Sequence, residues 1–318
     1  MSRRHFLVIL AAALLPIRLR AQQRPPRVGV LMLGEPSPVL FLEQLREGLR
    51  ELGYIEGQSI HLELRDAGGS LERLKVDARE LVDLRVDVIV GFQTPAVLAA
   101  KEATTALPII MCPAADPVAT GLVASLARPG GNLTGVTTAT AELAAKALSL
   151  MKEALPTIQR VGVIGNELDP FHAPFAESVI AAARALALEP KLVLARGGQD
   201  LQRAFGDVVA SGAEAVMVQP SLPRERSTQA AIEARLPLVV ANAEFGRVGA
   251  LIAYGVDIGA VYRQSAGFVD KIFKGRRPAD LPVEFATKFL LVVNLQTARL
   301  LGVSLPPSLI ARADEIVE

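Results

Sequence analysis

Several apolar segments of strand length end in a short polar step, and most of these steps precede a segment with helical periodicity. The steps are Gln93-Thr94-Pro95 after DVIVGF, Asp116-Pro117 after PIIMCPAA, Asn166 with Asp169-Pro170 after RVGVIG, and Gln219-Pro220 after EAVMV. In an open parallel α/β sheet, ligands bind in the crevice outside the carboxyl ends of the strands, where helix N-termini present free N–H groups. The pattern therefore predicts a protein that holds a small solute.

The first two steps also have a structural explanation. Thr is a good N-cap and Pro is favoured at the first helical position, so Thr94-Pro95 on its own indicates only the start of a helix. The Thr94 hydroxyl and the first free N–H groups would also suit an anionic group such as a carboxylate. Asp116 repeats the arrangement, and its carboxylate would additionally suit a ligand ammonium group.

Amide and ring side chains extend this set of candidate ligand contacts. Asn166 and Gln219 each carry an amide that donates and accepts at once, which suits an amino acid or hydroxy acid, although Asn166 is equally typical of an Asx turn. Tyr254 is one of only three Tyr in a chain without Trp, so it is one of few rings that can stack on a solute. The alternative is a Tyr at the edge of the core. Gly255 beside it would permit a close backbone approach or a hinge.

Signatures of enzymes and metal sites are missing from the sequence. His61 and His172 are too few and too scattered for a zinc cluster, and we find no GxSxG nucleophile elbow, P-loop or GxGxxG motif. Cys112 has no base placed beside it and is typical of a small buried hydrophobe. We therefore predict no catalytic residue, no metal site and no cofactor.

Apolar runs alternate with helical patterns along the 318 residues, which favours parallel βαβ units and about two domains. The predicted strands span 27–33, 59–65, 87–91, 108–111, 160–165, 190–195, 214–218, 237–241 and 289–294. Between them lie four apolar stripes with helical spacing. The stripes are Phe41, Leu45, Leu49 and Leu52; Leu71, Leu74, Ala78 and Leu81; Phe175, Val179, Ala182 and Leu186; and Val261, Phe268 and Ile272.

Three turn-rich or Pro-rich stretches mark places where the chain can pass between domains. They are 128–135, 249–257 and 274–284. Three crossings are the plan of a hinged solute receptor with two lobes. We predict one lobe from 27–136 plus about 255–281, and a second from 137–254 plus about 282–318.

The N-terminus has the layout of a cleavable signal peptide over residues 1–21. Arg3 and Arg4 precede an apolar run at 6–15, which is shorter than the roughly 20 residues that span a bilayer, and a short polar stretch ends at Ala21. Ser2-Arg3-Arg4-His5-Phe6-Leu7 is also similar to a twin-arginine signal, with a Sec signal as the alternative. We predict export, to the periplasm in a Gram-negative cell.

Charge and cysteine content narrow the function further. Removal of residues 1–21 takes away four Arg, so 34 basic residues become 30 against 33 acidic ones, a formal charge of −3. This balance does not suggest a nucleic-acid-binding surface. A single cysteine cannot form an intramolecular disulfide, so stability must come from the core, which 51% hydrophobic residues can supply.

Long segments of the chain closely resemble the ABC transporter substrate-binding proteins that include tryptophan- and tyrosine-type receptors. The segments are VDVIVGFQTPAVLAAKEAT, ADPVATGLVASLARPGGNLTGV, the AYG step, and KGRRPADLPVEFATKFLLVVNLQTARLLGVSLPPSLIARADEIVE. The resemblance implies the two-lobed α/β periplasmic-binding fold, a small solute between the lobes, and delivery by a monomer to a membrane permease powered by a separate ATPase. It also implies ligand contacts at Thr94, Asp116, Thr137, Thr138, Asn166, Gln219 and Tyr254.

The chain departs from these relatives at two of the steps. Phe92-Gln93 stands where many relatives have a small Gly, and GNELDP at 165–170 stands where they often read NPxxP. The solute is therefore expected to be an amino acid or another carboxylate, without a fixed aromatic specificity. Two other functions remain open at this stage. They are a sensory binding protein coupled to a chemoreceptor, and an exported α/β enzyme that acts through Asp116 and Asp169.

Overall fold

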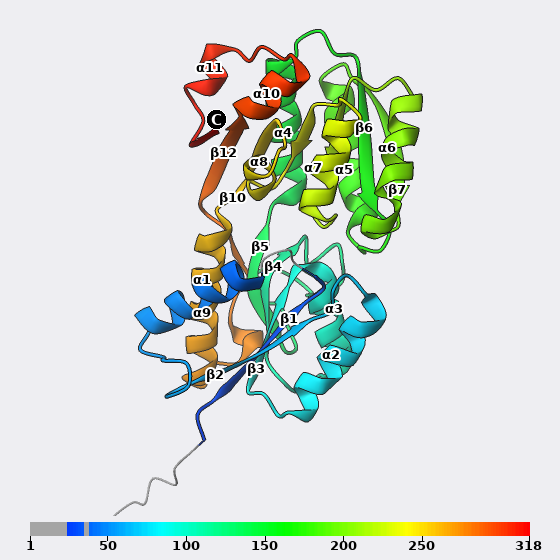
Figure 1. The fold of residues 1–318 in the computed structure, drawn as a ribbon. Coiled ribbons are helices and arrows are strands. Elements are labelled where there is room, and N and C mark those ends of the chain that lie inside the picture. The colour runs from blue at the N-terminus through cyan, green and yellow to red at the C-terminus, as the bar shows by residue number, and fades with distance from the viewer. Residues whose placement is uncertain (1–23, 35–37) are drawn as a thin grey trace, which may run out of the picture.

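The chain forms two lobes (Figure 1), as seen in a computed structural model in which residues 24–34 and 38–318 are described. The signal peptide predicted for 1–21 lies outside the described residues. Each lobe holds one sheet with helices on both faces, which confirms the predicted α/β fold of two sheets flanked by helices. None of the described helices is long and apolar enough to cross a membrane.

The first lobe is built on a six-stranded parallel sheet in the order β11-β5-β4-β3-β1-β2. Its strands are β1 (Arg27–Met32), β2 (His61–Asp66), β3 (Val88–Phe92), β4 (Ile109–Ala115), β5 (Leu133–Thr138) and β11 (Glu284–Phe285). Its helices are α1 (Pro38–Glu51), α2 (Leu71–Asp83), α3 (Gln93–Ala103), α9 (Ile258–Phe273) and the short 3-10 helix η2 (Pro278–Asp280). Helices α1 and α9 pack against each other, and so do α2 and α3, on opposite sides of the sheet in Figure 1.

The second lobe is built on a seven-stranded sheet in the order β13-β12-β10-β9-β8-β6-β7. Its strands are β6 (Arg160–Asn166), β7 (Glu189–Ala195), β8 (Ala215–Val218), β9 (Leu238–Val240), β10 (Ile252–Val256), β12 (Phe289–Asn294) and β13 (Glu315–Val317). Its helices are α4 (Thr140–Ala154), α5 (His172–Ala185), η1 (Gly197–Asp200), α6 (Leu201–Ala210), α7 (Arg224–Glu233), α8 (Glu244–Arg247), α10 (Leu295–Leu301) and α11 (Pro307–Ile310). All neighbours are parallel except β10 and β12, which run antiparallel.

The hydrophobic pattern explains most of these elements. Central strands such as β3 are buried on both faces, as continuous Val/Ile runs require, and the stripe residues Phe41, Leu45 and Leu49 of α1 are buried. Leu52 is an exception, since it follows the end of α1 and is 43% exposed. The edge strand β2 is only half-buried, which fits its alternation of apolar and polar residues.

Four described strands do not appear among the predicted ones: β5, β10, β11 and β13. Strand β5 contains Gly and three Thr, and β10 contains Gly, so both have the composition of turns or hinges, while the last two are only two and three residues long. Strand β11 lies beyond the 255–281 range predicted for the first lobe, yet it pairs with β5 of that lobe.

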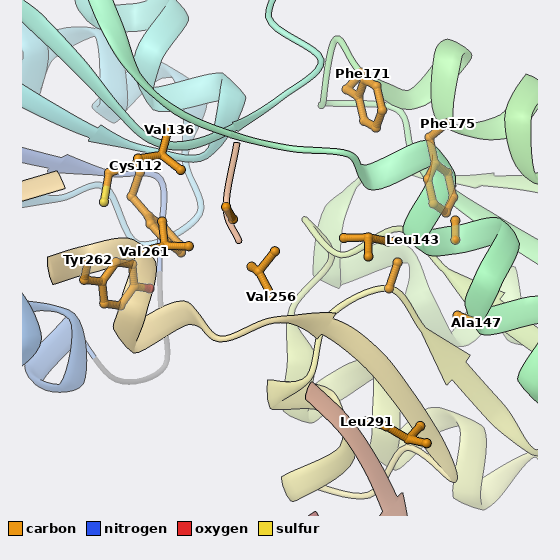
Figure 2. Packing of buried hydrophobic residues seen from close by; sticks show 14 of the residues in the cluster. Cys112, Val136, Leu143, Ala147, Phe171, Phe175, Val256, Val261, Tyr262 and Leu291 are labelled. Carbon is orange, nitrogen blue, oxygen red and sulfur yellow. The ribbon is translucent and has the colours of Figure 1, made fainter. Parts of the chain in front are cut away.

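The chain passes between the two sheets three times: from β5 to α4, from β10 to α9, and from β11 to β12. One buried apolar cluster extends through this region into both lobes. Figure 2 shows Val256 between apolar side chains of the first lobe, Val261 and Tyr262 among them, and Leu143 and Phe171 of the second. The lobes are therefore in apolar contact beside the crossings.

Candidate functional site

A pocket lies between the lobes at the carboxyl ends of β3, β4, β6 and β8. It has about 610 Å³ of space between atoms, part of it open to solvent. The first lobe contributes Phe92, Gln93, Thr94, Pro113 and Ala115, and the second contributes Asp169, Phe171, Gln219, Ser221 and Asn242, among others. The strand ends of both sheets thus meet at a single cavity.

Hydrogen bonds among buried side chains form the second-lobe wall of the pocket. The Gln219 side chain is 1% exposed, and its Nε2 donates to Oδ2 of Asp169 at 2.8 Å while its Oε1 accepts from the Asn166 N–H at 2.9 Å. Nδ2 of Asn166 donates to the Ser221 hydroxyl oxygen at 3.2 Å. These contacts join the end of β6 to the loop after β8. Together they form one hydrogen-bonded polar wall.

Asp169 is the charged member of this wall and is only 4% exposed. Its Oδ1 accepts from the Phe171 N–H at 2.9 Å, which forms an Asx-type turn before α5. Burial raises the pKa of the Asp169 carboxyl, and hydrogen bonds from Ser221, Phe171 and Gln219 partly oppose that rise. The carboxylate thus sits in the pocket wall with neutral protein donors as its immediate partners.

The first-lobe wall begins where β3 turns into α3. Helix α3 starts at Gln93, so Thr94 lies within its first turn and is not the N-cap that the sequence suggested. The Thr94 side chain is 2% exposed, and its Oγ1 accepts from the Ala115 N–H at 3.2 Å, which ties α3 to the end of β4. Gln93 lines the pocket with φ of 64°, a left-handed backbone that is rare outside Gly.

Thr137 and Thr138 have different positions although they are neighbours at the end of β5. Thr138 lines the pocket, and its hydroxyl oxygen lies 2.7 Å from that of Thr140. Thr137 is buried beside β4, and its hydroxyl donates to the Ala114 carbonyl oxygen at 2.8 Å. Only the second of the two predicted Thr contacts therefore faces the cavity.

The other predicted residues lie around the pocket or away from it. Asn166 lines an adjoining cavity, which shares Gln93 and Ser221 with the first pocket. Asp116 is exposed, and the Asp116-Pro117 step leads into a turn and not into a helix; its carboxylate accepts from the Ala119 N–H at 3.1 Å. Tyr254 lies within β10 and stacks on Phe289, and neither Asp116 nor Tyr254 is among the residues that line the described pockets.

Apolar side chains form the remaining wall of the pocket. Phe92 is buried beside Phe41 and Tyr262 in the first lobe, while Phe171 and Leu143 come from the second lobe (Figure 2). Phe92, Phe171 and Leu143 line the cavity directly, whereas Phe41 and Tyr262 do not. The site thus combines a polar wall with an apolar one, as expected for a solute that has both kinds of surface.

Two further cavities extend the cleft toward solvent. The adjoining cavity of about 620 Å³ is lined by backbone at Gly69, Gly197 and Gly198 and by the Arg224 side chain. Arg224 is already held by Glu225, at 3.3 Å from Nε to Oε1. A wider opening follows, lined by 68–72 of the first lobe and 194–203 of the second. The adjoining cavity therefore shares lining residues with both the pocket and the wider opening.

Sequence reasoning missed several pocket residues as ligand contacts. Asp169 and Ser221 belong to strand-end steps that the sequence did show, but nothing there ranked them above their neighbours. Asn242 lies two residues beyond the end of β9, and its position at a strand end is the same kind of signal as that of Asn166, the last residue of β6. Within the described ranges there is no group of three His, Cys, Asp or Glu side chains that could hold a metal ion. Burial raises the pKa of the Cys112 thiol to about 12, so it remains protonated.

Comparisons with known proteins agree with this geometry. The Tyrosine-binding protein of Clostridioides difficile is 26% identical over 290 residues, which cover 88% of this chain and 81% of that protein. A conserved domain protein from Vibrio cholerae has a structure with 27% identity and a TM-score of 0.86 over 92% of this chain and 100% of that one. An ABC domain from Streptococcus pneumonia, solved in complex with L-Trp, has 24% identity and a TM-score of 0.85 over 92% and 99%.

The family comparison covers nearly the whole described chain. Residues 28–317 match the sequence profile of the family described as ABC transporter substrate binding protein. This range contains both sheets, all three passages of the chain between them, and every residue of the pocket. The chain belongs to the family of ABC transporter substrate-binding proteins.

Proposed function

We propose that this protein is the exported receptor of an ABC importer, which captures a small solute between its lobes and delivers it to a membrane permease with a separate ATPase. The observation that carries the proposal is the pocket itself, in which buried polar side chains of the second lobe face Thr94 and the start of α3 in the first lobe. The solute is an amino acid or another small carboxylate. Its anionic end would face the N-terminal end of α3, where the helix dipole favours negative charge.

Hinge motion at the three passages between the lobes would open and close this pocket. A solute shifts the balance toward the closed form only by the contacts that it makes better there, which are the contacts supplied by the lobe that arrives second. The closed form would then present a surface from both lobes to the permease. We propose that the receptor acts as a monomer, because docking requires that surface to be free.

Thermal stability against a panel of amino acids, other carboxylates and nucleosides tests the binding function. A solute at about 100 times its dissociation constant should stabilise the fold by roughly 2.7 kcal/mol. Thr94→Ala should abolish that gain. Thr104→Ala is the matched control, because Thr104 lies at the other end of α3 and its hydroxyl oxygen also accepts a backbone N–H, from Leu107. Gains that are equal in both variants would place the solute elsewhere.

Transport and export need separate measurements. Cells without the gene should lose uptake of the labelled solute, whereas a sensory role would leave uptake unchanged and abolish chemotaxis toward it. Recovery of the bound solute unchanged after long incubation would count against the enzyme alternative. Substitution of both Arg3 and Arg4 by Lys should block export if the signal is of the twin-arginine type, while a Sec signal would tolerate the change.

A further inference from the structure

Asp169 is the one charged side chain among the described residues that line the inter-lobe pocket. All its lining neighbours are apolar or neutral polar residues, and the carboxylate itself is 96% shielded, since Asp169 is 4% exposed. The nearest basic residue of the cleft, Arg224, lines the adjoining cavity and is held by Glu225. The pocket therefore contains one buried acidic group.

No described Lys or Arg forms an ion pair with this carboxylate. Its hydrogen-bond partners are the Phe171 N–H at 2.9 Å, Nε2 of Gln219 at 2.8 Å and the Ser221 hydroxyl, which are all neutral. The His172 ring lies against the main-chain carbonyl oxygen of Asp169, with Nδ1 at 2.9 Å from it. The protein thus orients the carboxyl group through neutral donors, with the neighbouring His172 as a weak electrostatic contributor.

A buried charge without a counter-ion is unfavourable unless something else in the site neutralises it. Most buried ionised side chains are paired within the protein, and Asp169 is not. The wall around it contains Phe92, Phe171, Leu143 and Val256, which suit an organic body more than a hydrated metal ion. The missing partner thus has the chemistry of an organic cation.

We propose that Asp169 receives the ammonium group of the solute, so that the protein selects amines, and amino acids in particular, over carboxylates that lack an amine. This inference rests on the proposed solute-binding function and narrows it. It also moves the ammonium contact from Asp116, which the sequence favoured, to the second Asp-Pro step of the chain. The ammonium would complete a charge-assisted hydrogen bond with an acceptor that Gln219 and the Phe171 N–H already hold in place.

The Asx-type turn before α5 offers a purely structural reason for this residue. Asn forms such a turn as well as Asp does, through the same Oδ1 acceptor. Asp169→Asn therefore keeps the turn and removes only the charge. Asp66→Asn is the matched control, because Asp66 is exposed, accepts from the Gly68 N–H in the same two-residue turn at 3.0 Å, and lines none of the described pockets.

The test is calorimetric titration of the purified protein with L-tyrosine, L-tryptophan and L-leucine, each beside its deaminated analogue with hydrogen in place of the α-ammonium group. We expect the amine of at least one pair to bind about 100-fold more tightly than its analogue, and Asp169→Asn to remove that preference while Asp66→Asn retains it. Equal binding of amine and analogue, or an unchanged preference in Asp169→Asn, would overturn the inference. So would loss of the preference in Asp116→Asn alone.

A second measurement separates the charge from the turn and this inference from the proposed function. Ligand-free Asp169→Asn should melt at or above the wild-type temperature, whereas a residue with only a structural role should melt lower when changed. Binding of deaminated analogues that is sensitive to Thr94→Ala but not to Asp169→Asn would leave the proposed function standing and defeat this inference. Failure of every solute in the wider stability panel to stabilise the protein would defeat the proposed function itself.

Discussion

At the cleft edge of the first lobe, the chain leaves β3 and β4 through Gln93 and Asp116, which both have a left-handed backbone. At the cleft edge of the second lobe, the chain leaves β6 and β8 through Asn166 and Gln219, which are hydrogen-bonded to each other. The first edge is shaped by backbone conformation, and the second by a buried network of side chains. The second lobe therefore supplies a fixed polar surface, and the first supplies a wall that closes over it.

The largest effect should come from Gln219→Met, which breaks the network of the second lobe. It leaves the buried Asn166 N–H without its acceptor and Oδ2 of Asp169 without its Gln219 donor, and each loss costs about 1–3 kcal/mol. We expect about 2–4 kcal/mol lower stability in urea denaturation, together with loss of solute binding.

Gln229→Met on the exposed face of α7 is the control for this change. Gln229 contributes one hydrogen bond, from its Nε2 to Oε1 of Glu233 at 2.8 Å, on the protein surface. It should change stability by no more than about 0.5 kcal/mol. If the two variants lose the same stability, the difference between the lobes does not depend on the Gln219 network.

A smaller loss should follow Gly255→Ala, which tests how closely the second-lobe wall is packed. A Cβ at Gly255 would lie 2.6 Å from Cα of Asn242, so the pocket-lining turn after β9 must move. Overpacking of this kind typically costs about 1–3 kcal/mol, and we expect weaker solute binding with it. Gly267→Ala in α9 meets nothing within 4 Å and should be neutral or slightly stabilising. Unchanged binding in Gly255→Ala would show that the turn is not a rigid wall.

In the first lobe, a substitution that relieves backbone strain should raise the stability of the protein instead of lowering it. Gln93→Gly removes a side chain from a residue at φ 64°, which should raise stability by about 1 kcal/mol while it enlarges the pocket and weakens binding. Ala187→Gly, at φ 55° after α5, is the control that relieves strain away from the pocket. It should raise stability similarly and leave the calorimetric affinity as it was. If Gln93→Gly is less stable than the wild type, the Gln93 side chain stabilises the fold, and solute binding is not needed to explain it.

The smallest stability change should appear in the pH dependence of Asp169→Asn, because loss of the charge is partly offset by weaker hydrogen bonds. Burial raises the pKa of Asp169 in the folded state above its value in the unfolded chain. The contribution of this residue to the free energy of unfolding is therefore fully favourable below the unfolded pKa and is lost as the pH rises through the folded pKa. The Asn variant should therefore gain stability relative to wild type as the pH rises from acid to neutral. Parallel stability curves at all pH values would contradict a buried, unpaired charge.

Much of the fold could be predicted from the sequence because Val/Ile/Leu runs and helical stripes alternate with clear periods. The predictions fail where the signal is local and weak. Strand β5 contains Gly and Thr, and β10 contains Gly255, which packs closely against the backbone of Asn242 and Ala243. The antiparallel direction of β12 is set by the short link from β11, which carries no helix, and no hydrophobic period reports that direction.

The position of the site was predictable, while the orientation of its side chains was not. Three of the four strand-end steps line one cavity, and the Asp116-Pro117 step does not. Successive side chains of a strand point to opposite faces, however, so Thr138 lines the pocket whereas Thr137 is buried and bonds to Ala114 of β4. The two Asp-Pro steps are alike in sequence, but only Asp169 is followed closely by a helix and faces the cavity. Such choices depend on packing between the lobes, which local sequence does not encode.

Closure of the two lobes on a solute can be measured as a distance between spin labels. Val76 on α2 and Val209 on α6 are 46% and 47% exposed, and these helices lie on the same side of the molecule in Figure 1, away from the three passages between the lobes. The spin label should react only with the cysteines of Val76→Cys and Val209→Cys, because Cys112 is buried and its pKa is raised to about 12. With the solute that stabilises the protein most, the account predicts a shift to a shorter, narrower distance distribution that Gln219→Met abolishes. A solute that binds tightly and leaves the distribution unchanged would contradict capture between the lobes.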